Sequence, residues 1–210
     1  AGASRDTHRV CIAETEIIAV RSIVPSLKAA LADAGGVELK GHAAERLTEL
    51  IVEKDAGRGR SSSLNRHLIG KDVSVILAEA GLPCPAGSRI AFFEADESHP
   101  LVWSEQMMPV IPLVSVETAD AAIDFAKEVE RGFGHTAVMH SQNIANLSRM
   151  ARLMDVSIYV KNGPSYAGLG FGGEGFTTFT IASPTGEGLT RASTFTRERR
   201  CTLVDYFRIV

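Results

Sequence analysis

A cysteine thiolate is a strong nucleophile, so the cysteines come first among the residues that can do chemistry. The chain has three of them: Cys11, Cys84 and Cys201. Cys11 closely follows Arg5, His8 and Arg9, and nearby positive charge favours the thiolate form. Free cysteines are also commonly small buried hydrophobes. The neighbouring positive charges therefore make Cys11 the leading candidate for a nucleophile among the three cysteines, but they do not assign it that role.

A glutamate and two histidines are further candidates. Glu105 lies in the segment S-E-Q-M-M-P-V and is either a solvated loop carboxylate or a polar contact at a pocket edge. His135 and His140 stand five residues apart on an expected strand, so they point to opposite faces and do not share a metal ion without a bend. His135 follows Gly134 at the strand start, where βα units place functional groups less often than at carboxyl ends. The pattern therefore favours a plain hydrogen-bonded role for His140 and gives His135 little weight.

A glycine-rich segment invites a nucleotide-binding interpretation, because Gly168, Gly170 and Gly173 have G-x-G-x-x-G spacing. That fingerprint requires a strand before it and a helix after it, so that a pyrophosphate meets the helix N-terminus. Here the β-rich segment T-T-F-T-I follows instead. We therefore interpret the glycines as a tight loop that shapes the mouth of a site.

Hydrophobic periodicity predicts strands and helices in alternation. The predicted strands span residues 12–20, 89–94, 109–116, 136–140 and 156–160. The predicted helices span residues 24–34, 43–53, 73–80, 118–130 and 142–154, the last with Ile144, Leu147, Met150 and Ala151 facing inward. This alternation predicts an α/β fold with a mostly parallel sheet flanked by helices. Residues 54–63 are polar and rich in glycine and serine, which predicts a mobile loop. Two later strands, predicted at 177–181 and 200–206, would form a C-terminal β extension.

The composition is that of a globular chain, with 45% hydrophobic and 22% charged residues among 210. A formal net charge of −3 and a pI of about 6.1 give no reason to expect nucleic acid or an anionic membrane as a partner. No apolar run approaches the roughly 20 residues that span a bilayer, and the first residues form no signal peptide. Widely spaced cysteines without a C-x-x-C pair predict free thiols, no metal site and a cytoplasmic location.

Eight ordered segments together carry a resemblance. They are A-G-A-S (1–4), C-I-A-E-T-E-I-I (11–18), S-E-Q-M-M-P-V (104–110), G-H-T-A-V-M-H-S (134–141), V-K-N-G-P-S-Y-A-G-L-G (160–170), G-G-E-G-F-T-T-F-T-I-A (172–182), P-T-G-E-G-L-T (184–190) and F-T-R-E-R-R-C (195–201). In this order they resemble the CoA-acylating aldehyde dehydrogenases, most of all the ethanolamine- and propanediol-utilisation enzymes of bacterial microcompartments. The match covers nearly the whole chain, and residues 43–63 are its vaguest part.

The resemblance implies roles for four residues. Cys11 matches the nucleophile, which forms a thiohemiacetal with an aldehyde and, after hydride loss to NAD, a thioester that coenzyme A accepts. Glu105 matches the glutamate that contacts the nicotinamide ribose, and Met107 lies in the same cofactor-binding segment. His135 matches a histidine that assists the acylating chemistry as a base toward the CoA thiol. The implied cofactors are NAD and, as co-substrate, coenzyme A.

The resemblance also implies an architecture and partners. It predicts one aldehyde dehydrogenase catalytic domain over residues 1–210, whose last ~30 residues form an oligomerisation strand segment. The family's Rossmann-type cofactor domain, which precedes this segment, is expected to be absent from the chain. The implied substrate is acetaldehyde or propionaldehyde, and the implied partners are further copies of the chain and microcompartment shell or cargo proteins. The location is then the cytoplasm or the microcompartment lumen.

One departure and two alternatives stay open. The family usually has F-D-N-N where Arg5, Asp6, Thr7 and His8 stand here, and these residues are expected to shape the strand beside the nucleophile. Without a cofactor domain, no nicotinamide carbon comes within ~3–3.5 Å of a thiohemiacetal, so a truncated, inactive assembly module is one alternative. A thiol acyltransferase or esterase, which needs only Cys11 and a base, is the other.

Overall fold

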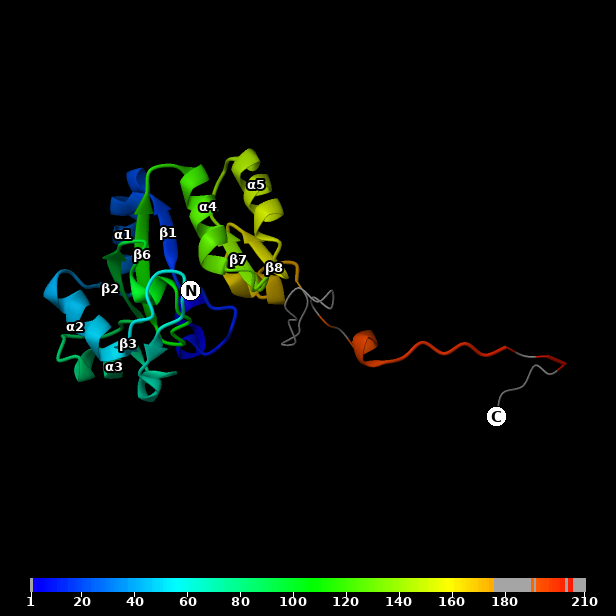
Figure 1. The fold of residues 1–210 in the computed structure, drawn as a ribbon, viewed down its shortest axis with the longest axis horizontal. Coiled ribbons are helices and arrows are strands. Elements are labelled where there is room, and N and C mark those ends of the chain that lie inside the picture. The colour runs from blue at the N-terminus through cyan, green and yellow to red at the C-terminus, as the bar shows by residue number, and fades with distance from the viewer. Residues whose placement is uncertain (1, 176–189, 191, 203, 206–210) are drawn as a thin grey trace.

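A computed structural model describes residues 2–175, 190, 192–202, 204 and 205. Its centre is a four-stranded sheet in the order β1-β6-β5-β2, in which every neighbouring pair is parallel (Figure 1). The strands are β1 (Ile17–Val20), β2 (Gly36–Glu38), β5 (Ile90–Ala95) and β6 (Val110–Val116). The predicted α/β fold with a mostly parallel sheet flanked by helices is confirmed.

Side-chain alternation along the central strands produces two buried faces. Phe92 and Ile111 face a cluster that includes Leu31 of helix α1 (Val24–Asp33). Ala91 and Phe93 face the opposite cluster, which helices α2 (His42–Ile51) and α3 (Val73–Glu79) cover. Both faces of a parallel sheet are covered in this way because its strands are apolar on both sides.

Helix α4 (Ala119–Glu130) packs against β1 and β6 on one side and against α5 (Ile144–Met154) on the other (Figure 1). Phe125 and Val129 of α4 pack against Trp103 and Val114 in one cluster. On the other side of α4, Ile123 contacts a cluster that contains Met150 of α5. Helix α4 therefore joins the central sheet to the second half of the molecule.

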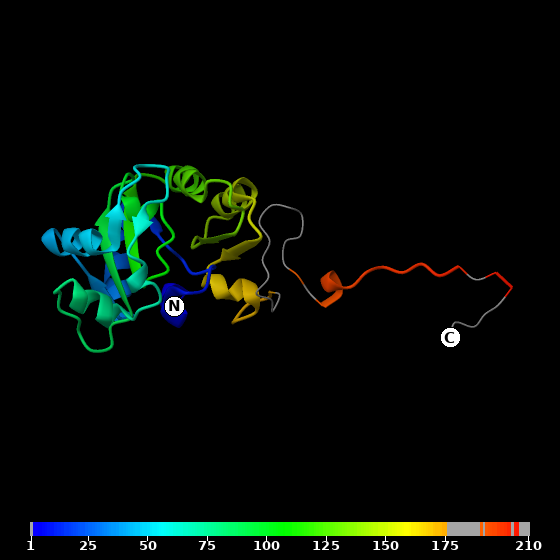
Figure 2. The same ribbon diagram turned by 60° about the horizontal axis from the view of Figure 1, so that its bottom comes forward.

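The smaller elements complete the described fold. A parallel pair joins β7 (Thr136–Met139) to β8 (Ile158–Lys161), and an antiparallel pair joins β3 (Val52–Lys54) to β4 (Ser63–Leu64). The short 3-10 helices are η1 (Gly2–His8), η2 (Arg21–Ile23), η3 (Arg66–Leu68), η4 (Pro100–Val102), η5 (Ser165–Leu169) and η6 (Ala192–Phe195). Within the described ranges, no helix is both long and apolar enough to cross a membrane. Figure 2 shows the first residues lying between the central sheet and the β8–η5 region.

Most predicted elements are confirmed, with three corrections. The strand predicted over 12–20 begins only at Ile17, because residues 10–13 form a turn. The helix predicted to reach residue 53 ends at Ile51, because the chain turns extended to pair with β4. In α5, Ile144 is 76% exposed and Ala151 is exposed, whereas Leu147, Met150 and Met154 are buried. The inward prediction for Ile144 and Ala151 was wrong, because the buried stripe runs through 147, 150 and 154.

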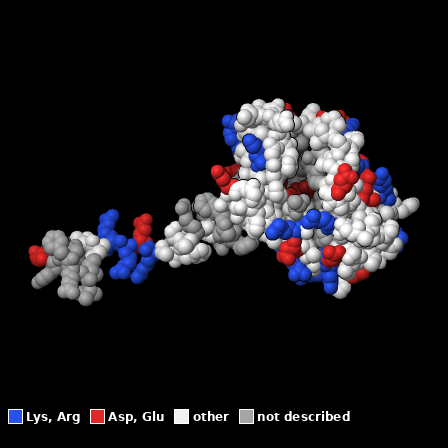
Figure 3. Space-filling model, turned by 180° about the vertical axis from the view of Figure 1, so that it is seen from behind, with Lys and Arg blue, Asp and Glu red and all other residues white. Residues whose placement is uncertain are grey.

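The structure describes only part of the predicted β extension. The strand predicted at 177–181 lies outside the described residues, as do 203 and 206 of the strand predicted at 200–206. The described residues of that second segment form no strand; they are exposed and project away from the folded body (Figure 1). Figure 3 shows charges of both signs on this projection, where Arg197, Glu198, Arg199 and Arg200 lie exposed.

The N-cap of α4 offers a test of the fold. Thr118 Oγ1 accepts a hydrogen bond from the N–H of Ala121 at 3.1 Å. We expect Thr118→Ala to lower the free energy of unfolding by about 1 kcal/mol, because a helix N–H loses its acceptor. Thr118→Ser keeps the hydroxyl and is the matched control. Urea titration followed by circular dichroism measures both, and equal destabilisation by the two variants would contradict the cap.

Candidate active site

The candidate residues gather at the amino ends of parallel strands. Cys11 lies ahead of β1, Glu105 ahead of β6 and His135 directly ahead of β7. Because β1 and β6 are parallel, their amino ends lie at the same edge of the sheet. The structure thus places the loops of Cys11 and Glu105 at the amino edge of the central sheet, and His135 at the amino end of β7 in the β7–β8 pair.

A tight turn presents the thiol of Cys11. The N–H of Ala13 donates to the carbonyl of Val10 at 2.9 Å, which places Cys11 and Ile12 at the corner. Ile12 is 1% exposed and packs with Ile158 and Tyr166, whereas Cys11 is exposed. The buried Ile12 therefore anchors the turn, and its neighbour Cys11 faces solvent.

The electrostatic surroundings of Cys11 oppose its ionisation. Although Cys11 is exposed, the surrounding protein covers part of its thiol, and this partial burial raises the pKa of the thiol. The negative charge of Glu105 raises this pKa further, and the backbone N–H of Cys11 acts in the opposite direction. The thiol is therefore protonated at neutral pH in this structure. Nucleophilic attack by Cys11 then requires a base or a change in the charge nearby.

The loop that carries Glu105 is held by its neighbours. Ser104 is buried, donates to the carbonyl of Pro100 at 2.8 Å and accepts from the N–H of Ser62 at 2.9 Å. Gln106 is fully buried and donates to the carbonyl of Leu101. Glu105, between these two anchors, is exposed. A carboxylate presented in this way is able to accept hydrogen bonds from a ligand.

His135 is half-buried and lies within electrostatic range of the same carboxylate. Its Nδ1 lies 2.7 Å from Thr136 Oγ1. Burial lowers the pKa of His135, while the charges of Glu105 and Glu130 raise it in part. The net lowering keeps the imidazole neutral at neutral pH, which is the form that accepts a proton. Because Glu105 acts on both Cys11 and His135, the three groups share one electrostatic neighbourhood.

The other predicted residues occupy different positions. Met107 lies in the Glu105 loop, is half-buried and has a φ of 52°. His140 is exposed at the far end of β7. Gly168 lies in η5, where a Cβ would stand 2.4 Å from Ile158 Cγ2, so this glycine allows η5 to pack against β8. The glycine-rich segment thus supports the turn that carries Cys11, since Ile12 packs in the same cluster.

The segment before the thiol differs from the strand-shaping role expected of it. Asp6, Thr7 and His8 all have positive φ, at 48°, 51° and 64°, and form a left-handed turn instead. Such a conformation is unfavourable for a β-branched residue, and Thr7 is one. Arg5 lies over the aromatic rings of Tyr166 and Phe171, at 5.5 and 4.9 Å from their centroids.

Sequence reasoning missed Glu14. Its Oε1 accepts from the N–H of Ser165 at 2.9 Å, at the start of η5. The N-cap residue of η5 is Pro164, which supplies no side-chain acceptor. The proline was the available signal, because a helix start without its own acceptor needs one from another part of the chain. Glu14 thereby holds the thiol segment against η5.

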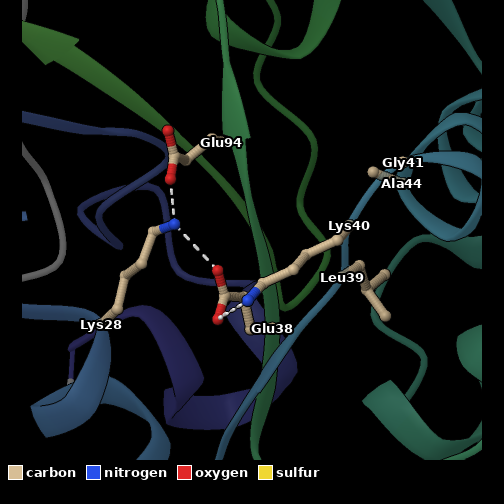
Figure 4. Close-up of a pocket in the computed structure, with 7 residues that line it drawn as sticks. All are labelled: Lys28, Glu38, Leu39, Lys40, Gly41, Ala44 and Glu94. Atoms are coloured by element: carbon tan, nitrogen blue, oxygen red, sulfur yellow. Dashed lines mark hydrogen bonds and ion pairs between the residues drawn. The ribbon is translucent and has the colours of Figure 1, made fainter. Parts of the chain in front are cut away.

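A charged pocket lies at the opposite, carboxyl edge of the central sheet (Figure 4). Its volume is about 370 Å³. Lys28 Nζ reaches from α1 to Glu94 and to Glu38, the latter at 2.8 Å, and Lys40 lies 3.2 Å from Glu38. The charges pair with one another, so they tie α1 to the ends of β2 and β5 and lie apart from the Cys11 edge.

Comparison with known proteins shows which enzymes this chain resembles. No protein-family model matches it. It is 45% identical over 209 residues to the acetylating acetaldehyde dehydrogenase EutE of Salmonella typhimurium, with 100% of this chain and 44% of that protein aligned. The chain is thus similar in sequence to an acetylating aldehyde dehydrogenase, over less than half of that protein's length.

Solved structures show the same resemblance in three dimensions. An engineered glycolyl-CoA reductase with bound NADP+ superposes with a TM-score of 0.87 at 45% identity, over 96% of this chain and 45% of that one. A Rhodopseudomonas palustris propionaldehyde dehydrogenase with bound CoA and an acylated cysteine gives the same TM-score, identity and coverage. The predicted resemblance to the CoA-acylating aldehyde dehydrogenases is therefore confirmed, and the chain spans less than half the length of the relatives it matches.

The effect of Glu105 on the thiol is testable. We expect Glu105→Gln to lower the pKa of Cys11, because a repelling negative charge is removed. Iodoacetamide alkylation of Cys11 across pH, followed by peptide mass spectrometry, measures the midpoint. Glu117→Gln is the matched control, because Glu117 follows β6 at the other edge of the sheet. An unchanged midpoint in Glu105→Gln would place the carboxylate away from the thiol.

Proposed function

We propose that this chain is the thiol-bearing catalytic part of an enzyme that oxidises a short-chain aldehyde to an acyl-CoA. The observation that carries the proposal is the exposed Cys11 thiol beside a carboxylate whose charge also acts on His135. The similarity of the whole chain to part of acylating enzymes, one of them solved with CoA and an acylated cysteine, supports the same reaction. Residues 1–210 then constitute the catalytic-domain part of that enzyme.

Cys11 is the proposed nucleophile. Its thiolate sulfur adds to the carbonyl carbon of the aldehyde, and the carbonyl oxygen takes up a proton, giving a thiohemiacetal. A nicotinamide cofactor, when bound, supplies the acceptor for the hydride whose loss leaves a thioester on Cys11. The CoA thiol then attacks this thioester carbonyl, and the acyl-CoA product leaves as the Cys11 thiolate is released.

His135 is the proposed base for the transfer to CoA. Its pKa is lowered by burial, so the neutral imidazole is available to take the proton of the CoA thiol. Protonation of His135 next to Glu105 is then stabilised by the opposite charge. The same carboxylate disfavours the Cys11 thiolate.

Glu105 and Met107 are the proposed cofactor contacts. The fit to a nicotinamide cofactor rests on the chemistry of an exposed carboxylate held between two buried anchors, Ser104 and Gln106. Such a carboxylate accepts hydrogen bonds from ribose hydroxyls. Met107 supplies an adaptable apolar surface beside it. NAD and CoA, as co-substrate, are therefore the proposed small-molecule partners, and a solved relative binds NADP+.

The proposed setting follows from the resemblance. The substrate is acetaldehyde or propionaldehyde, the assembly is a homo-oligomer, and the location is the cytoplasm or a microcompartment lumen with shell or cargo proteins nearby. One methylene of difference between the two aldehydes corresponds to about 0.8 kcal/mol of burial. A comparison of kcat/KM for the two aldehydes measures how the protein uses that difference.

The test is acyl-CoA formation from an aldehyde, CoA and NAD by the protein that carries this chain. We expect Cys11→Ala to reduce it by at least about 10³-fold, because the covalent route is removed. Cys84→Ala and Cys201→Ala are matched controls and are expected to keep the activity. Undiminished acyl-CoA formation by Cys11→Ala would refute the nucleophile, and a folded protein without NADH formation would favour the assembly module. NAD-independent thioester hydrolysis would favour the hydrolase.

A further inference from the structure

Gly70 contacts both halves of the candidate site. Its carbonyl accepts from Thr7 Oγ1 and from Arg9 Nη2, each at 3.0 Å, and these residues lie in the segment that leads to Cys11. Its N–H donates to the carbonyl of Met107 at 2.9 Å, in the Glu105 loop. The buried Gly70, through its N–H and its carbonyl, thus joins two segments that are far apart in the sequence.

The conformation at this point requires glycine. The N–H of Lys71 donates to the carbonyl of Leu68 at 3.1 Å, with Ile69 at φ −58°, ψ 126° and Gly70 at φ +68°. These values define a type II turn, whose third residue has positive φ. A Cβ at Gly70 would lie 2.2 Å from Arg9 Nε, so any side chain there displaces Arg9 from the carbonyl that it binds.

The turn is attached to the core on both sides. Leu68, before it, is fully buried, and Val73, after it, is 1% exposed in the same cluster as Met108. Asp72 caps α3 by accepting from the N–H of Ser74 at 2.9 Å. Gly70 is therefore held in place by the core, and its hydrogen bonds extend to the two loops that carry Cys11 and Glu105.

The strained segment before Cys11 depends on this fixed point. Asp6, Thr7 and His8 are left-handed, a conformation that L-residues adopt only when surrounding contacts impose it. Thr7 and Arg9 both bind Gly70, and Arg9 N–H also donates to Asp6 O at 3.1 Å. The hydrogen bonds to Gly70 thus hold the segment in a shape it would not take alone.

We propose that Gly70 is a positioning residue of the active site, which sets the separation of Cys11 and Glu105 by binding Thr7 and Arg9 on one side and Met107 on the other. The effect of Gly70 on catalysis rests on the proposed function, but its effect on the separation of the two loops does not. If Gly70 holds the two loops together, the influence of Glu105 on the thiol depends on Gly70. Loss of the bridge weakens that influence, because electrostatic interaction falls with distance.

The experiment is a double-mutant cycle on thiol reactivity. The shift in the Cys11 alkylation midpoint caused by Glu105→Gln is measured in the wild-type chain, in Gly70→Ala and in Gly87→Ala. Gly87 is the matched control, because it also has positive φ, at 82°, but a Cβ there meets nothing within 4 Å. We expect the shift to fall to less than half in Gly70→Ala and to stay unchanged in Gly87→Ala. An unchanged shift in folded Gly70→Ala would overturn the proposal.

A second variant keeps the test decisive if Gly70→Ala does not fold. Thr7→Val with Arg9→Met removes both side-chain donors to the Gly70 carbonyl and leaves the turn itself intact. We expect the same reduced shift, and an unchanged shift in this variant would equally overturn the proposal. kcat/KM for acyl-CoA formation is expected to fall at least tenfold in Gly70→Ala and not in Gly87→Ala. If the wild-type protein forms no acyl-CoA, the proposed function fails while the alkylation cycle still decides the role of Gly70.

Discussion

The parallel pairing of β1 with β6 is the constraint on which the site depends. It aligns Ile17 with Leu113, so the segments that precede the two strands end at the same edge of the sheet. Cys11 and Glu105 lie in those segments, 94 positions apart in the chain. The pairing alone brings the loops to the same edge, and local contacts then set their detailed positions. The turn anchored by Ile12 and the buried residues Ser104 and Gln106 provide those contacts.

The two edges of the sheet differ in electrostatic character. At the carboxyl edge, Lys28, Glu38 and Glu94 pair with one another and tie α1 to the strands. At the amino edge, Glu105 is exposed, the pKa of Cys11 is raised and the pKa of His135 is lowered. Paired charges serve the fold, whereas titratable groups with shifted pKa values in one neighbourhood are typical of catalysis. The strained Asp6–His8 turn lies on the same side as the shifted groups, as functional strain commonly does.

Local signals predicted the regular elements well. The β-branched run of residues 109–116 predicted the strand β6, and the interval from Thr118 to Gly132 predicted the helix α4; the structure confirms both. The short strands β2, β3 and β4 have no recognisable sequence pattern, because they are too short to show periodicity and their pairing depends on partners elsewhere in the chain. The resemblance identified Cys11, Glu105 and His135 by position, but their proximity depends on non-local pairing. The roles of Gly70 and Glu14 have the same origin, because their hydrogen bonds join segments distant in sequence.

The central claim is that the turn at residues 10–13 presents Cys11 as the thiol that carries an acyl group. Incubation of the protein with propionyl-CoA, without nicotinamide, lets a reactive thiol take the acyl group and release CoA. Peptide mass spectrometry then locates the propionyl thioester among Cys11, Cys84 and Cys201. The account predicts modification of Cys11 at least tenfold faster than of either other cysteine, with free CoA released in equal amount. Equal labelling of the three thiols, or faster labelling of Cys84 or Cys201, would contradict it.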